Sequence, residues 1–218
     1  MLFDAETVTF LADLAEHNDK EWFDANRGRY DEHFVGAGRR VVAALAPVLA
    51  ELSPELHAVP KVNGSMMRIH RDTRFSADKR PYKDHLDLMF WQGPGKSRQS
   101  PALMLRLTPT ALHVGAGQHG FDKAQLATYR EAVAGEAGEA LVPLLEGLRA
   151  DGYEVGGSHY KRVPRGYDAE HPRADLLRHA GLSAFWQGAP DQATLDSVAE
   201  HFRRLHPLVN WLDARLRG

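Results

Sequence analysis

Charged side chains are concentrated in residues 68–83, in a chain whose formal net charge is only −2. The cations of this block are Arg68, Arg71, Arg74, Lys79, Arg80 and Lys83. Guanidinium forks and ammonium groups are the side chains that hold phosphate or carboxylate, through bidentate or point-charge contacts. The pattern therefore predicts an anion-binding block, for which we nominate Arg68, Arg71, Arg74, Lys79 and Lys83.

The acids within and beside this block offer a second interpretation. Asp72, Asp78 and Asp84 could pair with the cations and leave a purely structural, salt-bridged loop. Six cations against three acids leave a surplus of three positive charges, which favours binding of a phosphate-containing small molecule. Asp72 could orient the arginines or act as a general base, and His70 could exchange protons near neutral pH. These two are the candidate catalytic residues, but neither identifies a reaction.

A second basic cluster, residues 159–168, repeats the mixture of cations, aromatic residues, proline and acid. Its candidate anion-binding residues are Lys161, Arg162 and Arg165. We expect the two clusters to line one cleft, with the second cluster as the opposite wall. Two separate solvated loops are the alternative.

Aromatic residues could complete such a pocket. Residues 19–30 place Trp22 and Asn26 on one helical face, and Tyr82 lies inside the first basic block. We nominate these three as pocket-lining residues. Ordinary core packing is the alternative for the helical face.

Several familiar motifs match only in part, because the residues or elements that each of them also requires are missing. His70-Arg71-Asp72 spells a kinase catalytic loop, but Ala77 stands where that loop needs asparagine. Residues 115–120 fit G-x-G-x-x-G, yet two helices are predicted to follow instead of a βαβ unit, so a tight strand-to-helix turn is favoured. The twelve histidines show no zinc spacing, and no serine lies in a G-x-S-x-G elbow. The sequence nominates no metal site and no cofactor.

Composition narrows the class of protein. The 218 residues include no cysteine, which excludes a disulfide framework and thiolate chemistry. The first residues lack a basic region followed by a long apolar run, and no apolar run approaches the roughly 18 residues of a membrane span. We therefore expect a cytoplasmic protein that does not enter a membrane.

Two other functions stay open at this point. The same cations could contact nucleic-acid phosphates while aromatic residues stack on bases, although the acidic net charge disfavours this. The basic block could instead brace a non-catalytic structural or partner-binding protein.

Hydrophobic periodicity places these residues on predicted elements. Helices are predicted at 5–17, 19–30, 33–52, 123–134, 137–150, 172–179 and from Asp191 onward. Strands are predicted at 64–71, 86–92, 102–108 and 111–116, with extended chain at 153–165 and an apolar segment at 182–186. Residues 102–116 form a β-hairpin around Pro109-Thr110, and Asp122 with Gln125 forms a capping box.

This order of elements predicts an α+β fold. We expect an antiparallel sheet of about four to six strands flanked by N-terminal and C-terminal helices. We expect one domain over 1–218, with a helical part at about 1–55, a sheet-bearing part at about 60–190 and a final helix at about 191–216.

The chain resembles a family, found mainly in bacteria and also in fungi, that is catalogued as a domain of unknown function. The resemblance rests on N-x-x-E-W-F-x-x-N-x-x-x-Y from Asn18 to Tyr30, on R-x-x-R-D-x-R-F-S-x-D-K-x-P-Y-K from Arg68 to Lys83, and on two shorter motifs. The shorter motifs are V-G-x-G at 114–117 and K-R-V-P-R-G-Y at 161–167. His70 departs from the family pattern, which has an aromatic residue there. The resemblance implies where a site lies and implies no reaction.

Overall fold

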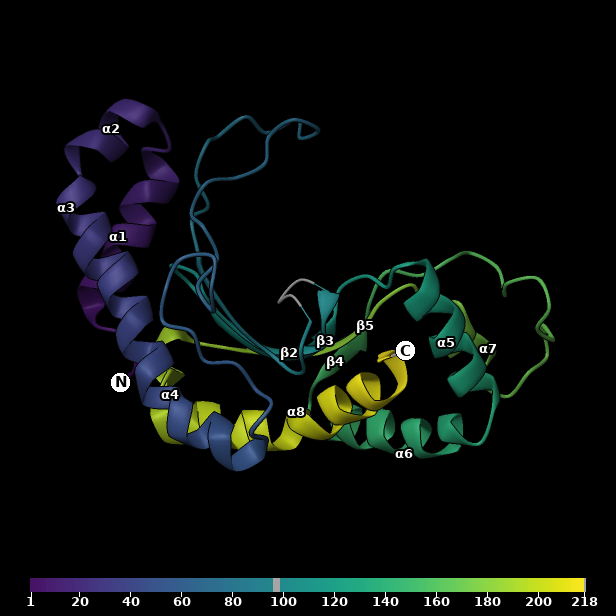
Figure 1. Ribbon diagram of the computed structural model, residues 1–218. Helices are drawn as coiled ribbons and strands as arrows, with labels where there is room; N and C mark the ends of the chain where they lie inside the picture. The colour runs from purple at the N-terminus through teal and green to yellow at the C-terminus, as the bar shows by residue number, and fades with distance from the viewer. Residues whose placement is uncertain (96–98, 218) are drawn as a thin grey trace. The chain divides into compact units, whose positions relative to one another are not determined.

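The computed structural model describes residues 1–95 and 99–217. They form an α+β fold whose antiparallel sheet has the strand order β1-β2-β3-β5-β4, with helices at both ends of the chain (Figure 1). The predicted fold class is confirmed, and the sheet of five strands lies within the predicted range.

The described residues fall into two compact units that alternate along the chain. Unit 1 comprises Met1–Phe90, Met104–Val114 and Gln187–Glu200, and unit 2 comprises Trp91–Leu103, Gly115–Trp186 and His201–Gly218. The prediction of one domain stays a prediction. No helix in the described part of the chain has both the length and the apolar character needed to cross a membrane.

The first helices of unit 1 begin at acidic caps. The Asp4 carboxylate accepts a hydrogen bond from the Thr7 amide (2.8 Å) at the start of α1 (Ala5–Glu16). Asp19 accepts one from the Trp22 amide (2.9 Å) at the start of α2 (Lys20–Ala25). Each carboxylate satisfies an amide that has no partner within its helix.

The helix predicted over 33–52 starts differently from the prediction. A short α3 (Arg27–Arg29) leads into a π-helix, η1 (Tyr30–Gly36), and α4 (Ala37–Leu52) follows without a break. Tyr30 and Phe34 are both buried, with ring centroids 5.3 Å apart. A π turn contains one residue more than an α turn, so the α-helical period located α4 but not η1.

The first three strands of the sheet each contain residues of unit 1. They are β1 (Leu86–Trp91), β2 (Ala102–Leu107) and β3 (Leu112–Gln118). Leu86, Leu88 and Phe90 are buried, so the residues between them point to the other face. The Thr108 amide donates to the Ala111 carbonyl (2.9 Å) across Pro109-Thr110, as the predicted hairpin requires.

The strand predicted at 64–71 is wrong. This segment makes isolated antiparallel bridges, Met66 with Leu88 and His70 with Tyr82, and no regular strand. Its alternating residues resemble a strand locally, but a regular ladder needs a partner of matching length.

Unit 2 contains α5 (Lys123–Ala134), α6 (Ala137–Ala150) and α7 (Ala174–Leu177), and β4 (Glu154–Gly156) pairs antiparallel with β5 (Leu182–Gly188). The predicted capping box at Asp122 and Gln125 is confirmed. Arg173 supports the end of α5, because its guanidinium donates to the carbonyls of Val133 (2.6 Å), Ala134 (2.9 Å) and Gly135 (3.0 Å).

The last helix begins later than predicted. Asp191 lies in a short 3₁₀ helix, η3 (Pro190–Gln192), and α8 spans Leu195–Leu216. The Thr194 hydroxyl accepts a hydrogen bond from the Ser197 amide (3.1 Å), which is the capping role we had assigned to Asp191. Aspartate and threonine are both common at helix starts, and the prediction placed the cap at the aspartate.

Candidate functional site

The basic block of residues 68–83 lies in unit 1 as a long loop (Figure 1, blue). The Lys83 amide donates to the Ile69 carbonyl (2.8 Å), and the Arg71 amide donates to the Pro81 carbonyl (2.9 Å). Residues 72–80 extend past this last backbone pair, and we call them the tip. The base of the loop is thus fixed by backbone pairing before the tip begins.

Two residues of the second helix region secure this base. Asn18 Oδ1 accepts from the Tyr82 amide (2.9 Å), and Asn18 Nδ2 donates to the Tyr82 carbonyl (3.0 Å). The Phe23 ring stacks on the Tyr82 ring with a centroid distance of 4.1 Å. Tyr82 is only 5% exposed, so its ring belongs to the core of unit 1.

The other nominated pocket residues have packing and capping contacts. Trp22 is half-buried and stacks on His17, with centroids 5.8 Å apart. Asn26 ends α2, where its side-chain amide donates to the Trp22 carbonyl (2.9 Å). Whether Trp22, Asn26 or Tyr82 contacts a ligand stays a prediction.

Carboxylates neutralise much of the block. Asp78 forms a fork with Arg80, at 2.8 Å to Nη2 and 3.0 Å to Nε, and also binds Arg71 Nη1 at 2.7 Å. The hydrogen bonds from Arg80, and then that from Arg71, hold the pKa of Asp78 well below its usual value. Arg80 also lies 3.8 Å from Asp84. This part of the block is an ion-pair network.

The candidate catalytic residues do not share a contact. Asp72 forms a fork with Arg74, at 2.9 Å to Nε and 2.7 Å to Nη2, and these hydrogen bonds lower the pKa of Asp72 to about 2. A carboxylate with so low a pKa is a weak base at neutral pH. The exposed His70 lies instead beside Tyr82, with ring centroids 5.2 Å apart.

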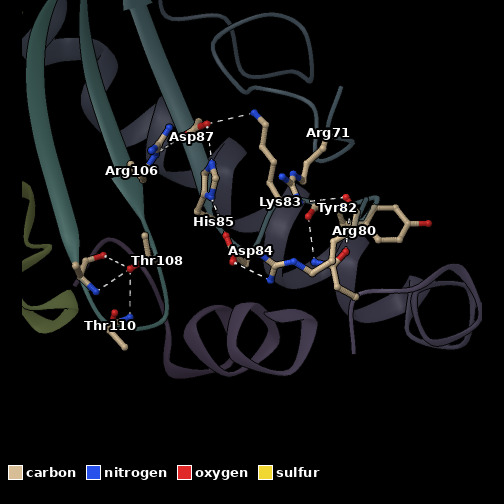
Figure 2. Close-up of polar contacts among 12 residues, drawn as sticks. Arg71, Arg80, Tyr82, Lys83, Asp84, His85, Asp87, Arg106, Thr108 and Thr110 are labelled. Carbon is tan, nitrogen blue, oxygen red and sulfur yellow. Dashed lines mark hydrogen bonds and ion pairs between the residues drawn. The ribbon is translucent and has the colours of Figure 1, made fainter. Parts of the chain in front are cut away.

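Asp87 is the centre of an ion-pair cluster that the sequence did not reveal. Its side chain is 16% exposed and contacts Arg106 Nε at 2.6 Å, Lys83 Nζ at 3.2 Å and His85 Nε2 at 3.3 Å (Figure 2). Burial by itself raises the pKa of Asp87, but the hydrogen bonds from His85 and Arg106 outweigh it and hold the pKa well below its usual value. The nominated anion ligand Lys83 is therefore paired with a carboxylate.

Arg106, the β2 residue that contacts Asp87, lies next to a further histidine, His113 on β3. The turn bond between Thr108 and Ala111 sets a register in which Arg106 lies opposite His113. Burial, and then the positive charges of Arg106 and His85, lower the pKa of His113. Cross-strand register, which a linear motif search does not use, is the signal that could have found this row of Asp87, Arg106 and His113.

Two cations of the first block form no ion pair with any residue that the structure describes. Arg68 and Lys79 are exposed and form no ion pair within residues 1–95 and 99–217, although Lys79 Nζ donates to the Thr73 carbonyl (2.9 Å). The tip also presents Phe75, whose side chain is 95% exposed. Arg74 lies over the Phe75 ring, 5.7 Å from its centroid.

Within the described part of the chain, the cations of the second basic cluster are unpaired, unlike most of those in the first block. Lys161, Arg162 and Arg165 are exposed, and their side chains make no hydrogen bond or ion pair with any residue that the structure describes. The backbone that carries them is anchored, since the Tyr160 amide donates to the Arg178 carbonyl (2.8 Å). This cluster lies in unit 2, and the expectation that it faces the first block across one cleft stays a prediction.

The glycine motif at 115–120 serves packing. A Cβ added to Gly115 would lie 2.1 Å from the Phe185 ring, and one added to Gly117 would lie 2.1 Å from the Leu182 carbonyl oxygen. Gly117 also has a φ of +130°, which side chains rarely adopt. These contacts agree with the expected tight turn, because glycine allows β3 to approach β5 closely.

Metal ligands do not gather in the described part of the chain: no group of three or more His, Asp or Glu side chains there could hold an ion.

Comparison with protein families assigns the chain. Residues 6–211 match the model of the family described as "Conserved hypothetical protein (DUF2461)", and the chain belongs to this family. The match includes most of both units and all the candidate residues above. A search of curated proteins finds no match.

Proposed function

We propose that this member of the DUF2461 family binds a phosphate-containing small molecule through exposed cations that have no carboxylate partner. The observation that carries the proposal is the cluster of Lys161, Arg162 and Arg165, which are all exposed and unpaired among the described residues. Cations held close together by an anchored loop repel one another, and a bound polyanion relieves that repulsion.

The chemistry of the cluster suits a phosphate group. Two guanidinium groups can each offer a fork to phosphate oxygens, and the lysine adds a mobile point charge. Tyr160 lies next to the cluster, half-exposed, with Arg130 5.1 Å from its ring centroid. An aromatic ring at this position offers a flat surface for an organic part of the ligand.

The first basic block contributes less to this function than its composition suggested. Arg71, Arg74, Arg80 and Lys83 each pair with an aspartate, so a ligand would have to compete with those carboxylates. Arg68 and Lys79 are the members of the block that an anion could reach without such competition. Internal bracing, the structural alternative, accounts for the paired members.

The test is a ligand panel measured against a charge-matched pair of variants. Inorganic phosphate, pyrophosphate, nucleotides and sugar phosphates are screened by thermal shift, and positive compounds are titrated calorimetrically. A ligand at 100 times its Kd adds about 2.7 kcal/mol to the free energy of unfolding. The variant Lys161→Glu/Arg162→Glu/Arg165→Glu should lose that stabilisation.

The control reverses three exposed cations elsewhere, Lys20→Glu/Arg39→Glu/Arg149→Glu, and so makes the same change in net charge. It should bind as the wild type does. Absence of binding by every compound to a folded wild-type sample, or equal binding by both triple variants, would overturn the proposal.

Phe75 favours a second candidate function, binding of single-stranded nucleic acid. An aromatic side chain that is 95% exposed beside Arg74 resembles a base-stacking position flanked by a phosphate contact. Labelled oligonucleotides in fluorescence anisotropy should then bind more weakly as salt rises, and Phe75→Ala should weaken binding at every salt concentration. Binding that is absent, or unaffected by Phe75→Ala, excludes this function.

A further inference from the structure

The sheet face of unit 1 carries a row of charged and titratable residues that the proposed function does not use. Asp87 on β1, Arg106 on β2 and His113 on β3 lie side by side on the face opposite Leu86 and Leu88. They come from three different strands, so their positions are fixed by backbone pairing of the sheet. Figure 2 shows Asp87 and Arg106 in this arrangement.

Asp87 orients the guanidinium of Arg106. The Nε atom of Arg106 donates to Asp87 Oδ1 at 2.6 Å, while the Nη1 and Nη2 groups have no polar partner among the described residues. The Arg106 side chain is 49% exposed, so its terminal NH₂ groups can reach a ligand. A guanidinium held at Nε keeps its remaining donors in a fixed direction, which suits an oxyanion.

The carboxylate of Asp87 is shared among several potential cations. Lys83 and His85 also contact it, so three potential cations surround one acid. Asp84 lies beyond, where its Oδ1 atom contacts His85 Nδ1 at 3.0 Å. With His85 neutral, Lys83 and Arg106 balance Asp87 and Asp84; with His85 protonated, the cluster has a surplus of positive charge.

His113 is the other free group of the row. It is half-buried, and neither ring nitrogen makes a hydrogen bond or ion pair within the described part of the chain. The charged groups that act on it are Arg106 and His85, which disfavour its protonated form, and Asp87, which favours it. A neutral imidazole opposite a partly free guanidinium can accept a proton once an anion supplies compensating negative charge.

We propose that Arg106 and His113 form an oxyanion-binding site on this face of the sheet, in which His113 takes up a proton when the anion binds. The ligand class is a phosphate, sulfate or carboxylate group. Arg106 donates through its Nη groups, and the protonated imidazole donates to a second oxygen. The proton comes from solvent, and no covalent bond forms or breaks.

The site shares an anionic ligand class with the proposed function but none of its residues. The two can therefore fail separately. Sulfate is the appropriate probe, because it keeps its double charge over the pH range in which histidine titrates and so adds no titration of its own.

The first measurement follows the wild-type histidine signals by NMR from pH 5 to 9, without and with saturating sulfate. The His113 signal is identified by its loss in His113→Gln. Its midpoint should lie below the usual histidine value near 6.5 without sulfate and rise by about one pH unit with it. An unchanged midpoint overturns the proposal. The midpoint is measured on the wild type, and His113→Gln serves only to identify the signal.

The second measurement is calorimetric titration with sulfate at several pH values. The association constant of the wild type should fall as the pH rises through the two midpoints, by about tenfold in total, because a one-unit rise in pKa on binding is linked to a tenfold change in affinity. His113→Gln should remove that slope, and Arg106→Gln should weaken binding at least about tenfold. Circular dichroism confirms that each variant is folded.

The loop variant Lys161→Glu/Arg162→Glu/Arg165→Glu separates the two ideas. Sulfate binding that this variant retains, and that Arg106→Gln loses, supports the sheet site. Sulfate binding that the loop variant loses, and that both His113→Gln and Arg106→Gln retain with the wild-type pH dependence, overturns the sheet site and leaves the proposed function standing. Absence of sulfate binding to the wild type overturns the sheet site as well.

Discussion

Asn18 holds the backbone of Tyr82 at two atoms, although the residues are 64 positions apart in the chain. Its side-chain oxygen and nitrogen replace the two hydrogen bonds that a neighbouring strand would supply. Tyr82 in turn stacks on Phe23. The motif around Asn18 and the basic block are thus parts of one packed structure in unit 1, and this explains why each contains aromatic residues beside its polar ones.

Removal of the Asn18 side chain is expected to destabilise unit 1. Asn18→Ala leaves the amide and the carbonyl of the buried Tyr82 without their partners, which should lower the free energy of unfolding by about 1–3 kcal/mol. Asn18→Asp keeps the acceptor and loses the donor, so a smaller loss is expected. Urea unfolding monitored by fluorescence gives both values. Equal stability of Asn18→Ala and the wild type contradicts the assigned role.

Asp87→Asn should cost more, because it removes the carboxylate, which is only 16% exposed, from its contacts with Lys83 and Arg106. The expected loss at pH 7 is about 2–4 kcal/mol. The matched control is Asp191→Asn, at an exposed position, with an expected change of less than about 0.5 kcal/mol.

The same substitution should change the response to acid. The pKa of Asp87 is lower in the folded protein than its usual value of 3.8, so ionised Asp87 stabilises the fold above that pH. This contribution is lost as the pH falls from 3.8 through the folded value. The stability difference between the wild type and Asp87→Asn should therefore be constant near neutral pH and shrink below about pH 4. A difference that grows in acid contradicts the assignment.

Two glycines of the 115–120 motif should differ in their tolerance of alanine. Gly117→Ala places a Cβ 2.1 Å from the Leu182 carbonyl at a φ of +130°, and should destabilise the protein by about 2–4 kcal/mol. Gly120→Ala meets nothing within 4 Å and should change stability by less than about 1 kcal/mol. Thermal unfolding of the two variants decides. Similar losses at both positions contradict the packing role.

Arg173→Lys tests the fork that supports α5. A lysine keeps the charge but cannot donate to Val133, Ala134 and Gly135 together, so a loss of about 1–2 kcal/mol is expected. Amide hydrogen exchange should also quicken in the last turn of α5, while the capped first turn at Asp122 keeps its protection. If amide hydrogen exchange in the last turn of Arg173→Lys is as slow as in the wild type, the Arg173 contacts do not stabilise the end of α5.

The sequence predicted the features that depend on neighbouring residues. The capping box at Asp122 and the hairpin at Pro109-Thr110 involve positions only three apart, and both are present. The start of α8 was misplaced at Asp191, three residues before Thr194, whose hydroxyl accepts a hydrogen bond from the Ser197 amide. The π-helix at 30–36 was missed because it interrupts the α-helical period by one residue.

Features that depend on pairing between residues far apart in the chain could not be predicted from the sequence. Residues 64–71 alternate as a strand does, but their partners at 81–89 provide separate bridges. The candidate site shows the same limit. Arg68 and Lys79 lie in the block that composition identified, whereas Arg106 and His113 become neighbours of Asp87 only through the register of three strands.

The basic loop is closed by backbone pairing at its base, before its tip begins. Pairing of Ile69 with Lys83 and of Arg71 with Pro81 is complete before residue 72, so residues 72–80 add nothing to the backbone ladder below them. A two-residue turn could connect the same ends. Because the loop is closed without them, residues 72–80 act on the base through side chains instead, as the 2.7 Å contact between Asp78 and Arg71 shows.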